Sequence, residues 1–314
     1  MATPLVSICC ITYNHAPFIR QCLDGFLMQK TSFPIEILIH DDCSTDGTTE
    51  IVREYASKYP DLIFPLYETE NQYCKPGRES MDFYNYRRAR GKYIAYCEGD
   101  DYWTDPLKLQ KQVDFMEANP EYSLCVHGIE VHDLLRGRTY RHQYDVPDGI
   151  GVDITPAIYF TQHYVQPLSM VFRRSMFSFD WSKRYHGYRD THEIYHLLKA
   201  GKGRFMNFYG GVYAKHQGGI CSSIGNVKNC LIEQVHTTEL YKLNPKDRDV
   251  LQPYLKSILL WCLDEYRSHQ QIRYYWHSLY RILIDTPEVF CSVFTKEIHR
   301  AIKQIYKKIK KKAL

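Results

Sequence analysis

The sequence predicts an α/β protein with a mostly parallel sheet flanked by helices, followed by a C-terminal helical appendage. Apolar, β-branched runs typical of strands alternate with segments of helical periodicity through the first third of the chain. From about residue 226 onward, the apolar pattern is helical to the end. Hydrophobic residues make up 44% of the chain and charged residues 24%, as in folded globular proteins. We therefore expect an α/β domain over residues 1–225 and a helical region over residues 226–314 with a basic amphipathic tail.

The first elements alternate between strands and helices. Residues 18–30 carry apolar side chains at helical spacing, and a second helix is expected to end near Tyr59. This order favours parallel strands with helices on both faces, and ligands of such sheets bind beyond the carboxyl ends of the strands. The expected strands are short apolar runs bounded by turn residues, and they cover 6–12, 35–40, 62–67 and 92–97.

The middle of the chain continues the mixed pattern. Pro106 opens a helical segment at a position where its missing N–H is harmless, and Gly201 closes another as a typical C-terminal residue. The remaining expected elements are a helix over 106–119, strands over 122–128 and 169–172, a loop or hairpin over 136–151 and a helix over 191–200.

The cysteine pattern and the lack of long apolar segments favour a cytoplasmic protein. The 11 cysteines are scattered without a C-x-x-C pair, which is typical of free thiols in a reducing compartment. The first residues lack the basic start and long apolar core of a signal peptide. No apolar run approaches the ~20 residues needed to cross a bilayer. We expect a cytoplasmic protein, with peripheral attachment to the inner face of the membrane as the alternative.

The positive charge is concentrated at the C-terminal end. The net charge is +4, yet residues 296–312 alone hold eight Lys or Arg against one acid, Glu297. In a helix, this pattern is typical of an anchor on an anionic membrane, and a helix packed on the protein body is the alternative. Because the rest of the chain has no basic excess, nucleic acid is not expected as a partner. One helical face would hold Ile298, Ala301, Ile302, Ile305 and Ile309.

An acidic cluster follows the strand expected at 92–97. The segment Glu98–Asp101 reads E-G-D-D and precedes two aromatic residues. Neighbouring buried carboxylates repel one another, so such a cluster needs a cation. Mg²⁺ and Mn²⁺ prefer oxygen ligands and bridge carboxylates to diphosphates. The cluster therefore favours a divalent metal site, with a solvated acidic turn as the alternative.

A second acidic segment, Asp41–Thr48, follows the strand expected at 35–40 and reads D-D-C-S-T-D-G-T. Asp and Ser are good turn formers and helix caps, so a capping role is one interpretation. A carboxylate at this strand end is also suited to accept an N–H from a base or a ribose hydroxyl. Because both acidic segments follow strands of one parallel sheet, we expect them to line the same crevice.

Three motifs follow one another in a fixed order. Residues 4–14 read P-L-V-S-I-C-C-I-T-Y-N, residues 41–48 fit D-D-x-S-x-D-x-T, and residues 91–103 read G-K-Y-I-A-Y-C-E-G-D-D-Y-W. Together they resemble the opening strand, the second acidic element and the metal-binding D-x-D stretch of family-2 glycosyltransferases of the bacterial polysaccharide type. Glu98 stands where the family has the first Asp of D-x-D, which keeps a carboxylate there. The resemblance covers about residues 4–220 and implies the GT-A fold.

The resemblance also implies contacts with a nucleotide donor and a metal. Asp101 would bind Mn²⁺ or Mg²⁺, and Glu98 would support that site. His216, in a segment similar to Y-R-x-H-x-G-G, would reach the metal or the diphosphate. Ala214 replaces the Arg of that segment, so its phosphate contact is expected to be missing or supplied by Lys215. The implied donor-nucleotide residues are Thr12, Tyr13, Asn14, Asp42 and Asp100.

Asp190 is the expected general base. It lies eleven positions before Gly201, which is the spacing of the catalytic acidic residue in the family. An inverting transfer needs one carboxylate to take the proton of the attacking hydroxyl. The alternative role for Asp190 is an N-cap of the following helix. Glu193 is the second candidate for the base, although its position one turn into the helix favours a solvated side chain.

These motifs predict an inverting, metal-dependent glycosyltransferase. It would move a sugar from a nucleoside-diphosphate sugar, expected to be UDP-linked, to a hydroxyl on a glycan or lipid-linked glycan. Its expected partners are this donor, this acceptor and an anionic membrane surface that the tail contacts. The alternative is a catalytically silent nucleotide- or carbohydrate-binding protein on the same fold, which the intact Asp100, Asp101 and Asp190 disfavour.

Overall fold

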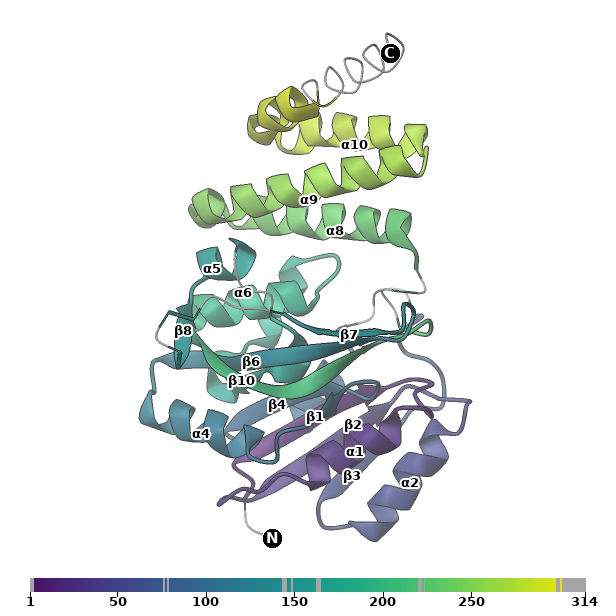
Figure 1. Cartoon of the computed structure of the whole chain (residues 1–314), viewed down its shortest axis with the longest axis vertical. Helices are drawn as coiled ribbons and strands as arrows, with labels where there is room; N and C mark the ends of the chain where they lie inside the picture. The colour runs from purple at the N-terminus through teal and green to yellow at the C-terminus, as the bar shows by residue number, and fades with distance from the viewer. Residues whose placement is uncertain are drawn as a thin grey trace. The chain divides into compact units, whose positions relative to one another are not determined.

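The computed structural model divides the chain into two compact units, Met1–Ser222 and Ser223–Leu314 (Figure 1). It describes residues 3–297 and residue 300, except 76, 78, 143–145, 148, 162–164, 220, 221 and 223. The apolar residues expected on one face of the basic tail, from Ile298 to Ile309, therefore lie outside the described residues.

The first unit is built on one mixed sheet with the strand order β3-β2-β1-β4-β9-β6-β10-β5. Its first four strands are parallel to one another, as the sequence predicts. Since all four point the same way, their carboxyl ends lie along one edge. These strands are β1 (Val6–Thr12), β2 (Ile35–Asp41), β3 (Ile63–Tyr67) and β4 (Tyr93–Glu98).

The other half of the sheet is joined through one short antiparallel strand. β9 (Val171–Arg173) pairs antiparallel with both β4 and β6 (Tyr122–Asp133), so β6 runs in the direction of β4. β10 (Lys202–Lys215) is parallel to β6 and also ends at the edge where β1 and β4 end. The remaining strands are antiparallel to their partners: β5 (Tyr102–Trp103), β7 (Arg138–Arg141) and β8 (Gly151–Ile154).

Helices cover both faces of this sheet, because successive strand residues enter different core clusters. Ile8 packs in a cluster with residues of α1 (Ile19–Leu27), α2 (Thr48–Lys58) and α4 (Lys108–Ala118). Its neighbour Cys9 packs in a second cluster, which includes residues of α3 (Phe83–Arg88) and α6 (Asp190–Ala200). Both sides of the central strands are therefore buried, which explains their continuous apolar runs. This unit also contains the short helix α5 (Pro156–Thr161).

Two parts of the first unit differ from the sequence-based expectation. β6 extends to Asp133, beyond the strand expected over 122–128. β7 pairs antiparallel with β6, which agrees with the hairpin alternative for residues 136–151. β10 was not predicted from the sequence. Its pairing with β6 contains register shifts between Met206 and Tyr209 and between Tyr209 and Gly211. These bulges break the two-residue alternation that marks a regular strand.

Lys108 is fully buried at the start of α4. Its ammonium lies 4.0 Å from the centre of the Trp103 ring, and its Nζ donates to Gln112 Oε1 at 2.9 Å. Burial lowers the pKa of Lys108 to about 7. Between this value and the unfolded value of ~10.4, the unfolded chain binds a proton that the folded chain does not, so stability rises with pH across that window.

The first testable prediction follows from this buried charge. We expect Lys108→Met to stabilise the protein by about 1–3 kcal/mol at pH 6, where wild-type Lys108 is still charged, and by less at pH 9. Urea unfolding of both proteins at both pH values measures this difference. Both proteins hold the same cysteines, so the effect of thiol ionisation on stability cancels when the two are compared. Lys111→Met is the matched control, because Lys111 is partly exposed and ion-paired with Asp105. A Met variant that is less stable than wild type at pH 6 would refute the prediction.

The second unit is helical. Its core includes Cys230, Cys262 and Tyr266, which join α8 and α9. In the part of the chain that the structure describes, no helix is long and apolar enough to cross a membrane. The helices are α8 (Asn226–Leu243), α9 (Arg248–Ser268), α10 (Ile272–Asp285) and a further helical segment over 287–297.

Candidate active site

The candidate site lies at the edge where the parallel strands end. In the sheet register, Thr12 at the end of β1 is opposite Asp41 at the end of β2. Ile11 is opposite Glu98 at the end of β4. β10 then places Ala214 and His216 at the same edge, because the backbone and side chain of these residues contact the acidic cluster after β4. Segments far apart in the sequence thus meet beyond the carboxyl ends of the strands, as expected for such a sheet.

The loops after β1 and β2 are bonded to each other. Asn14 lies in the left-handed region with φ of 56°, its N–H donates to Ser44 Oγ at 2.9 Å, and its Oδ1 accepts the N–H of Thr45 at 2.8 Å. Asp46 accepts the N–H groups of Ala16 and Thr48, at 2.9 and 3.0 Å. The second acidic segment therefore braces the first loop. Asn14, expected at the donor nucleotide, is part of that brace.

Thr12, Tyr13 and Asp42 differ in their surroundings. The carboxylate of Asp42 is buried and accepts the backbone N–H groups of Gln72 and Tyr73, at 2.6 and 3.0 Å. Tyr13 is 45% exposed, so its ring is available for stacking. Thr12 Oγ1 is buried and has no hydrogen-bond partner among the described residues. The structure thus brings these three residues to one edge and leaves the Thr12 hydroxyl and the Tyr13 ring unengaged there.

The carboxylates of Glu98, Asp100 and Asp101 form the centre of the site. One oxygen from each lies within 4.8 Å of the others, a spacing that suits a shared metal ion. Asp101 Oδ1 accepts the N–H of Ala214 at 2.9 Å, which fixes its orientation. A Cβ at Gly99 would lie 2.7 Å from Thr12 Oγ1, so only glycine lets the acidic turn pack against β1.

The electrostatics of the cluster favour a bound cation. Burial and the nearby carboxylates of Asp100, Asp82 and Asp190 raise the pKa of Glu98 to about 8. Burial, Asp100 and Glu98 likewise raise the pKa of Asp101 well above its usual value. Without a cation, the fold therefore disfavours the charged form of both groups, and a divalent ion would reverse this.

Two histidines adjoin the cluster through Asp100. His216 Nε2 lies 3.0 Å from Asp100 Oδ2, and His15 Nε2 lies 3.6 Å from the same oxygen. Burial acts to raise the pKa of Asp100, but the His216 hydrogen bond and the charge of His15 lower it overall. The Phe18 ring packs on His216 with centroids 4.4 Å apart. Among the described residues, the group that could hold a metal consists of Glu98, Asp100 and Asp101. His216 is not one of them and contacts the group through Asp100.

The start of α6 places Asp190 and Glu193 differently from each other. Asp190 is the first residue of the helix and is exposed, while Arg189 occupies the cap position, so the N-cap alternative for Asp190 is wrong. Glu193 is only 3% exposed and accepts the Tyr86 hydroxyl at 3.0 Å. The expectation of a solvated Glu193 is therefore also wrong. The Glu193 side chain points into the core beside α3, where the Tyr86 hydroxyl donates a hydrogen bond to its carboxylate.

The whole arrangement agrees with one family of enzymes. Residues 7–179, more than half of the chain, match the description "Glycosyl transferase family 2". The chain belongs to glycosyl transferase family 2. This membership confirms the resemblance that the three strand-end motifs carry.

Known relatives match parts of this chain. It is 46% identical over 126 residues to the uncharacterized protein Mb1547 of Mycobacterium bovis, covering 40% of this chain and 35% of Mb1547. It is 38% identical over 132 residues to TuaG of Bacillus subtilis, a putative teichuronic acid biosynthesis glycosyltransferase, covering 41% of this chain and 49% of TuaG. The chain thus spans half or less of the length of these relatives.

Solved structures confirm the GT-A-like fold of the chain. Residues 1–349 of S. aureus TarS, in complex with UDP-GlcNAc, superpose with a TM-score of 0.63 at 17% identity, covering 92% of this chain and 83% of that one. The mannosyltransferase PcManGT of Pyrobaculum calidifontis, in complex with GDP-Man and Mn²⁺, gives a TM-score of 0.55 at 17% identity, covering 98% and 83%.

Sequence reasoning missed two residues that act on the acidic cluster of the candidate site. His15 directly follows the Tyr13-Asn14 motif but carries no signal of its contact with Asp100. Asp82 precedes α3, and its charge raises the pKa of both Glu98 and Glu193. No strand-end motif marks Asp82, because its place in the site depends on how α3 packs against the second face of the sheet.

Proposed function

We propose that this glycosyltransferase moves one sugar from a nucleoside-diphosphate sugar to a hydroxyl of a glycan or lipid-linked glycan, with inversion at the anomeric carbon. The observation that carries the proposal is the cluster of the partly buried Glu98 and the buried Asp100 and Asp101 at the strand ends. The bound UDP-GlcNAc of TarS supports UDP as the nucleotide, whereas PcManGT binds GDP-Man. The name of TuaG supports a surface polysaccharide as the acceptor.

We propose Mn²⁺ or Mg²⁺ as the cofactor, held by Asp101 and Glu98 with Asp100 beside them. The donor set fits, because all three side chains offer hard oxygen ligands and Asp100 Oδ1 is buried without a hydrogen bond from the described residues. When bound, the ion would neutralise charge on the departing nucleoside diphosphate. His216 would orient Asp100 and reach toward the diphosphate. The Mn²⁺ bound by PcManGT supports the choice of metal.

Asp190 is proposed as the general base. Its charge contributes to the raised pKa of Glu98, and its exposed side chain is open to an acceptor. The acceptor oxygen forms a bond to the anomeric carbon as the bond from that carbon to the diphosphate oxygen breaks. The electron pair leaves with the nucleoside diphosphate, and the acceptor proton moves to Asp190. Attack on the face opposite the leaving group inverts the configuration.

The same proposal covers the organisation of the chain. The compact unit Met1–Ser222 supports residues 1–225 as the catalytic domain, and Ser223–Leu314 supports residues 226–314 as a helical region. We further propose that the protein acts in the cytoplasm, at the inner face of the membrane, where the basic tail contacts anionic lipid. The eight Lys and Arg residues over 296–312 support this placement.

A panel of nucleotide sugars tests the proposed function. We expect release of nucleoside diphosphate from one UDP-sugar among UDP-GlcNAc, UDP-glucose and UDP-galactose, only with Mn²⁺ or Mg²⁺ and increased by a glycan acceptor. GDP-mannose is the comparison donor, and turnover restricted to it would overturn the choice of UDP. If the protein binds a donor but releases no nucleoside diphosphate with any acceptor, the catalytically silent binding protein is favoured. Full turnover in excess chelator would overturn the metal.

A further inference from the structure

Helix α10 of the second unit has an exposed apolar side. Its opposite side is buried through Ser278, Leu279 and Ile282. Trp276 is 63% exposed and Tyr280 is 61% exposed, which is unusual for such large side chains. Because residues four apart lie on the same side of a helix, the exposed residues form one continuous stripe. This apolar stripe consists of Ile272, Trp276, Tyr280, Leu283 and Ile284.

The charges beside the apolar stripe are basic. Arg273, His277 and Arg281 are exposed and follow the stripe along one edge of the helix. The single acid of α10, Asp285, is already paired with Arg281 at 2.6 Å and with Lys242 at 3.1 Å. A negatively charged surface would therefore meet apolar and cationic groups but no unpaired carboxylate of this helix.

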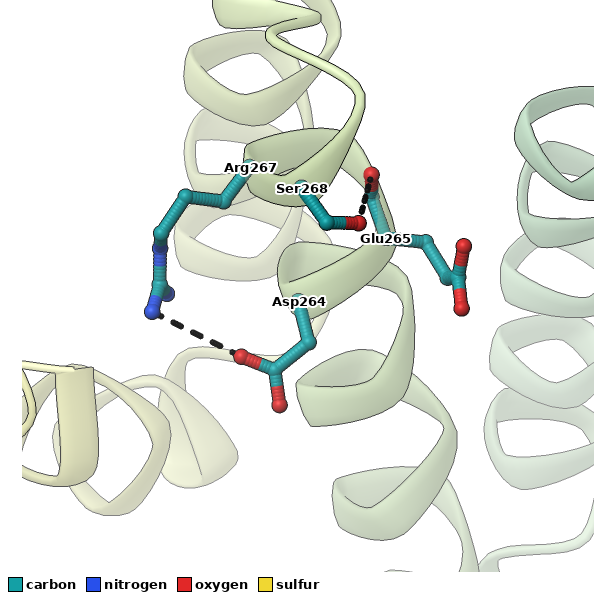
Figure 2. A pocket seen from close by; sticks show the side chains of 4 residues that line it. All are labelled: Asp264, Glu265, Arg267 and Ser268. Carbon is teal, nitrogen blue, oxygen red and sulfur yellow. Dashed lines mark hydrogen bonds and ion pairs between the residues drawn. The ribbon is translucent and has the colours of Figure 1, made fainter.

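The basic end of the chain starts from the same helical unit. Glu297 is buried and accepts hydrogen bonds from Arg267 and from the Tyr275 hydroxyl, the latter at 2.9 Å. These contacts hold the segment 287–297 on α9 and α10. Figure 2 shows Arg267 near the end of α9, paired with Asp264, at a hollow whose charged groups pair within the unit. All four residues that line this hollow belong to α9.

This chemistry favours a lipid surface over a second copy of the chain. A two-fold contact through α10 would bring Arg273 and Arg281 of the two copies toward each other, and like charges oppose such an interface. Trp and Tyr are the side chains that prefer the headgroup level of a bilayer, and neighbouring basic residues attract anionic lipid. An apolar stripe with a basic edge is the pattern of a helix that lies in the membrane interface.

We propose that the apolar stripe of α10 docks the protein on an anionic bilayer, with Trp276 and Tyr280 inserted at the headgroup level. Arg273 and Arg281 contact lipid phosphates. The surface acts together with the basic tail but is separate from it, and the proposal does not depend on the transferase activity.

Vesicle sedimentation of the full chain tests this surface. The vesicles are phosphatidylcholine with about 30% phosphatidylserine, and the variant is Trp276→Ser with Tyr280→Ser. We expect its partition onto these vesicles to fall about tenfold, although residues 296–314 are unchanged. Val235→Ser, at another exposed apolar residue of the second unit, is the matched control and should bind like wild type. Equal thermal unfolding midpoints of the three proteins show that folding is intact.

Two results would overturn the proposal. Unchanged vesicle partition of the double variant would mean that the stripe does not touch lipid and that any binding comes from the tail alone. A wild-type dimer in sedimentation equilibrium that becomes a monomer in the double variant, without vesicle binding by either protein, would make the stripe a self-association surface. Turnover with soluble donor and acceptor is measured separately, so a failure of the proposed reaction leaves the vesicle result interpretable.

Discussion

In the Asp101→Asn variant, we expect metal-dependent turnover to fall by about 10³-fold or more. The amide keeps the shape of the side chain and its bond from Ala214, but it removes the charge that a divalent ion needs. Loss of several kcal/mol of charge stabilisation in the transition state corresponds to a change of this size. Turnover with the preferred donor and Mn²⁺ binding by titration calorimetry are the two measurements, and both should decline together.

Stability separates this effect from misfolding. In the absence of metal, Asp101 is repelled by Glu98 and Asp100, so its neutral replacement should unfold at the same temperature as wild type or higher. Mn²⁺ should raise the unfolding temperature of wild type but not of the variant. Asp114→Asn, at an exposed carboxylate of α4, is the matched control with unchanged activity. If Asp101→Asn binds Mn²⁺ normally, the ligand assignment is wrong.

The parts of the site that the sequence predicts are those encoded by local pattern. The apolar runs that end at Thr12, Asp41 and Glu98 identify parallel strands, and parallel strands bring their ends to one edge. The two acidic segments could therefore be placed together before any coordinates were known. Their spacing along the chain carries the family signature as well.

The parts that sequence reasoning missed depend on contacts between distant segments. Glu193 has the sequence position of a solvated helix residue, but α6 packs against the sheet and Tyr86 supplies a hydroxyl from α3. Asp42 has the expected position, yet its oxygens bind the backbone at Gln72 and Tyr73. β10 is hidden by its bulges near Gly211. For Glu193 and Asp42, the hydrogen-bond partners lie at least thirty residues away along the chain. For β10, the register shifts break the alternation that marks a strand in the sequence.

The Asp190→Asn variant is expected to lose about 10²–10⁴-fold in turnover, the range typical of losing a general base. An amide cannot take the proton of the attacking hydroxyl. Donor affinity should change little, because Asp190 is exposed and acts on Glu98 only through its charge. Single-turnover kinetics with saturating donor, together with UDP binding measured by calorimetry, separate the chemical step from binding.

Glu193→Gln is the comparison that decides between the two carboxylates. The Gln carbonyl oxygen can still accept the Tyr86 hydroxyl, so the fold and turnover should both be retained to within a few-fold. The wild-type side chain is nearly fully buried, and burial with Asp82 and Asp190 nearby raises the pKa of its carboxyl well above the usual value. A buried carboxyl that already accepts the Tyr86 hydroxyl is poorly suited to receive a proton from an acceptor. If Glu193→Gln is crippled while Asp190→Asn is mild, α6 must shift to open Glu193 to the acceptor, and the base is then Glu193.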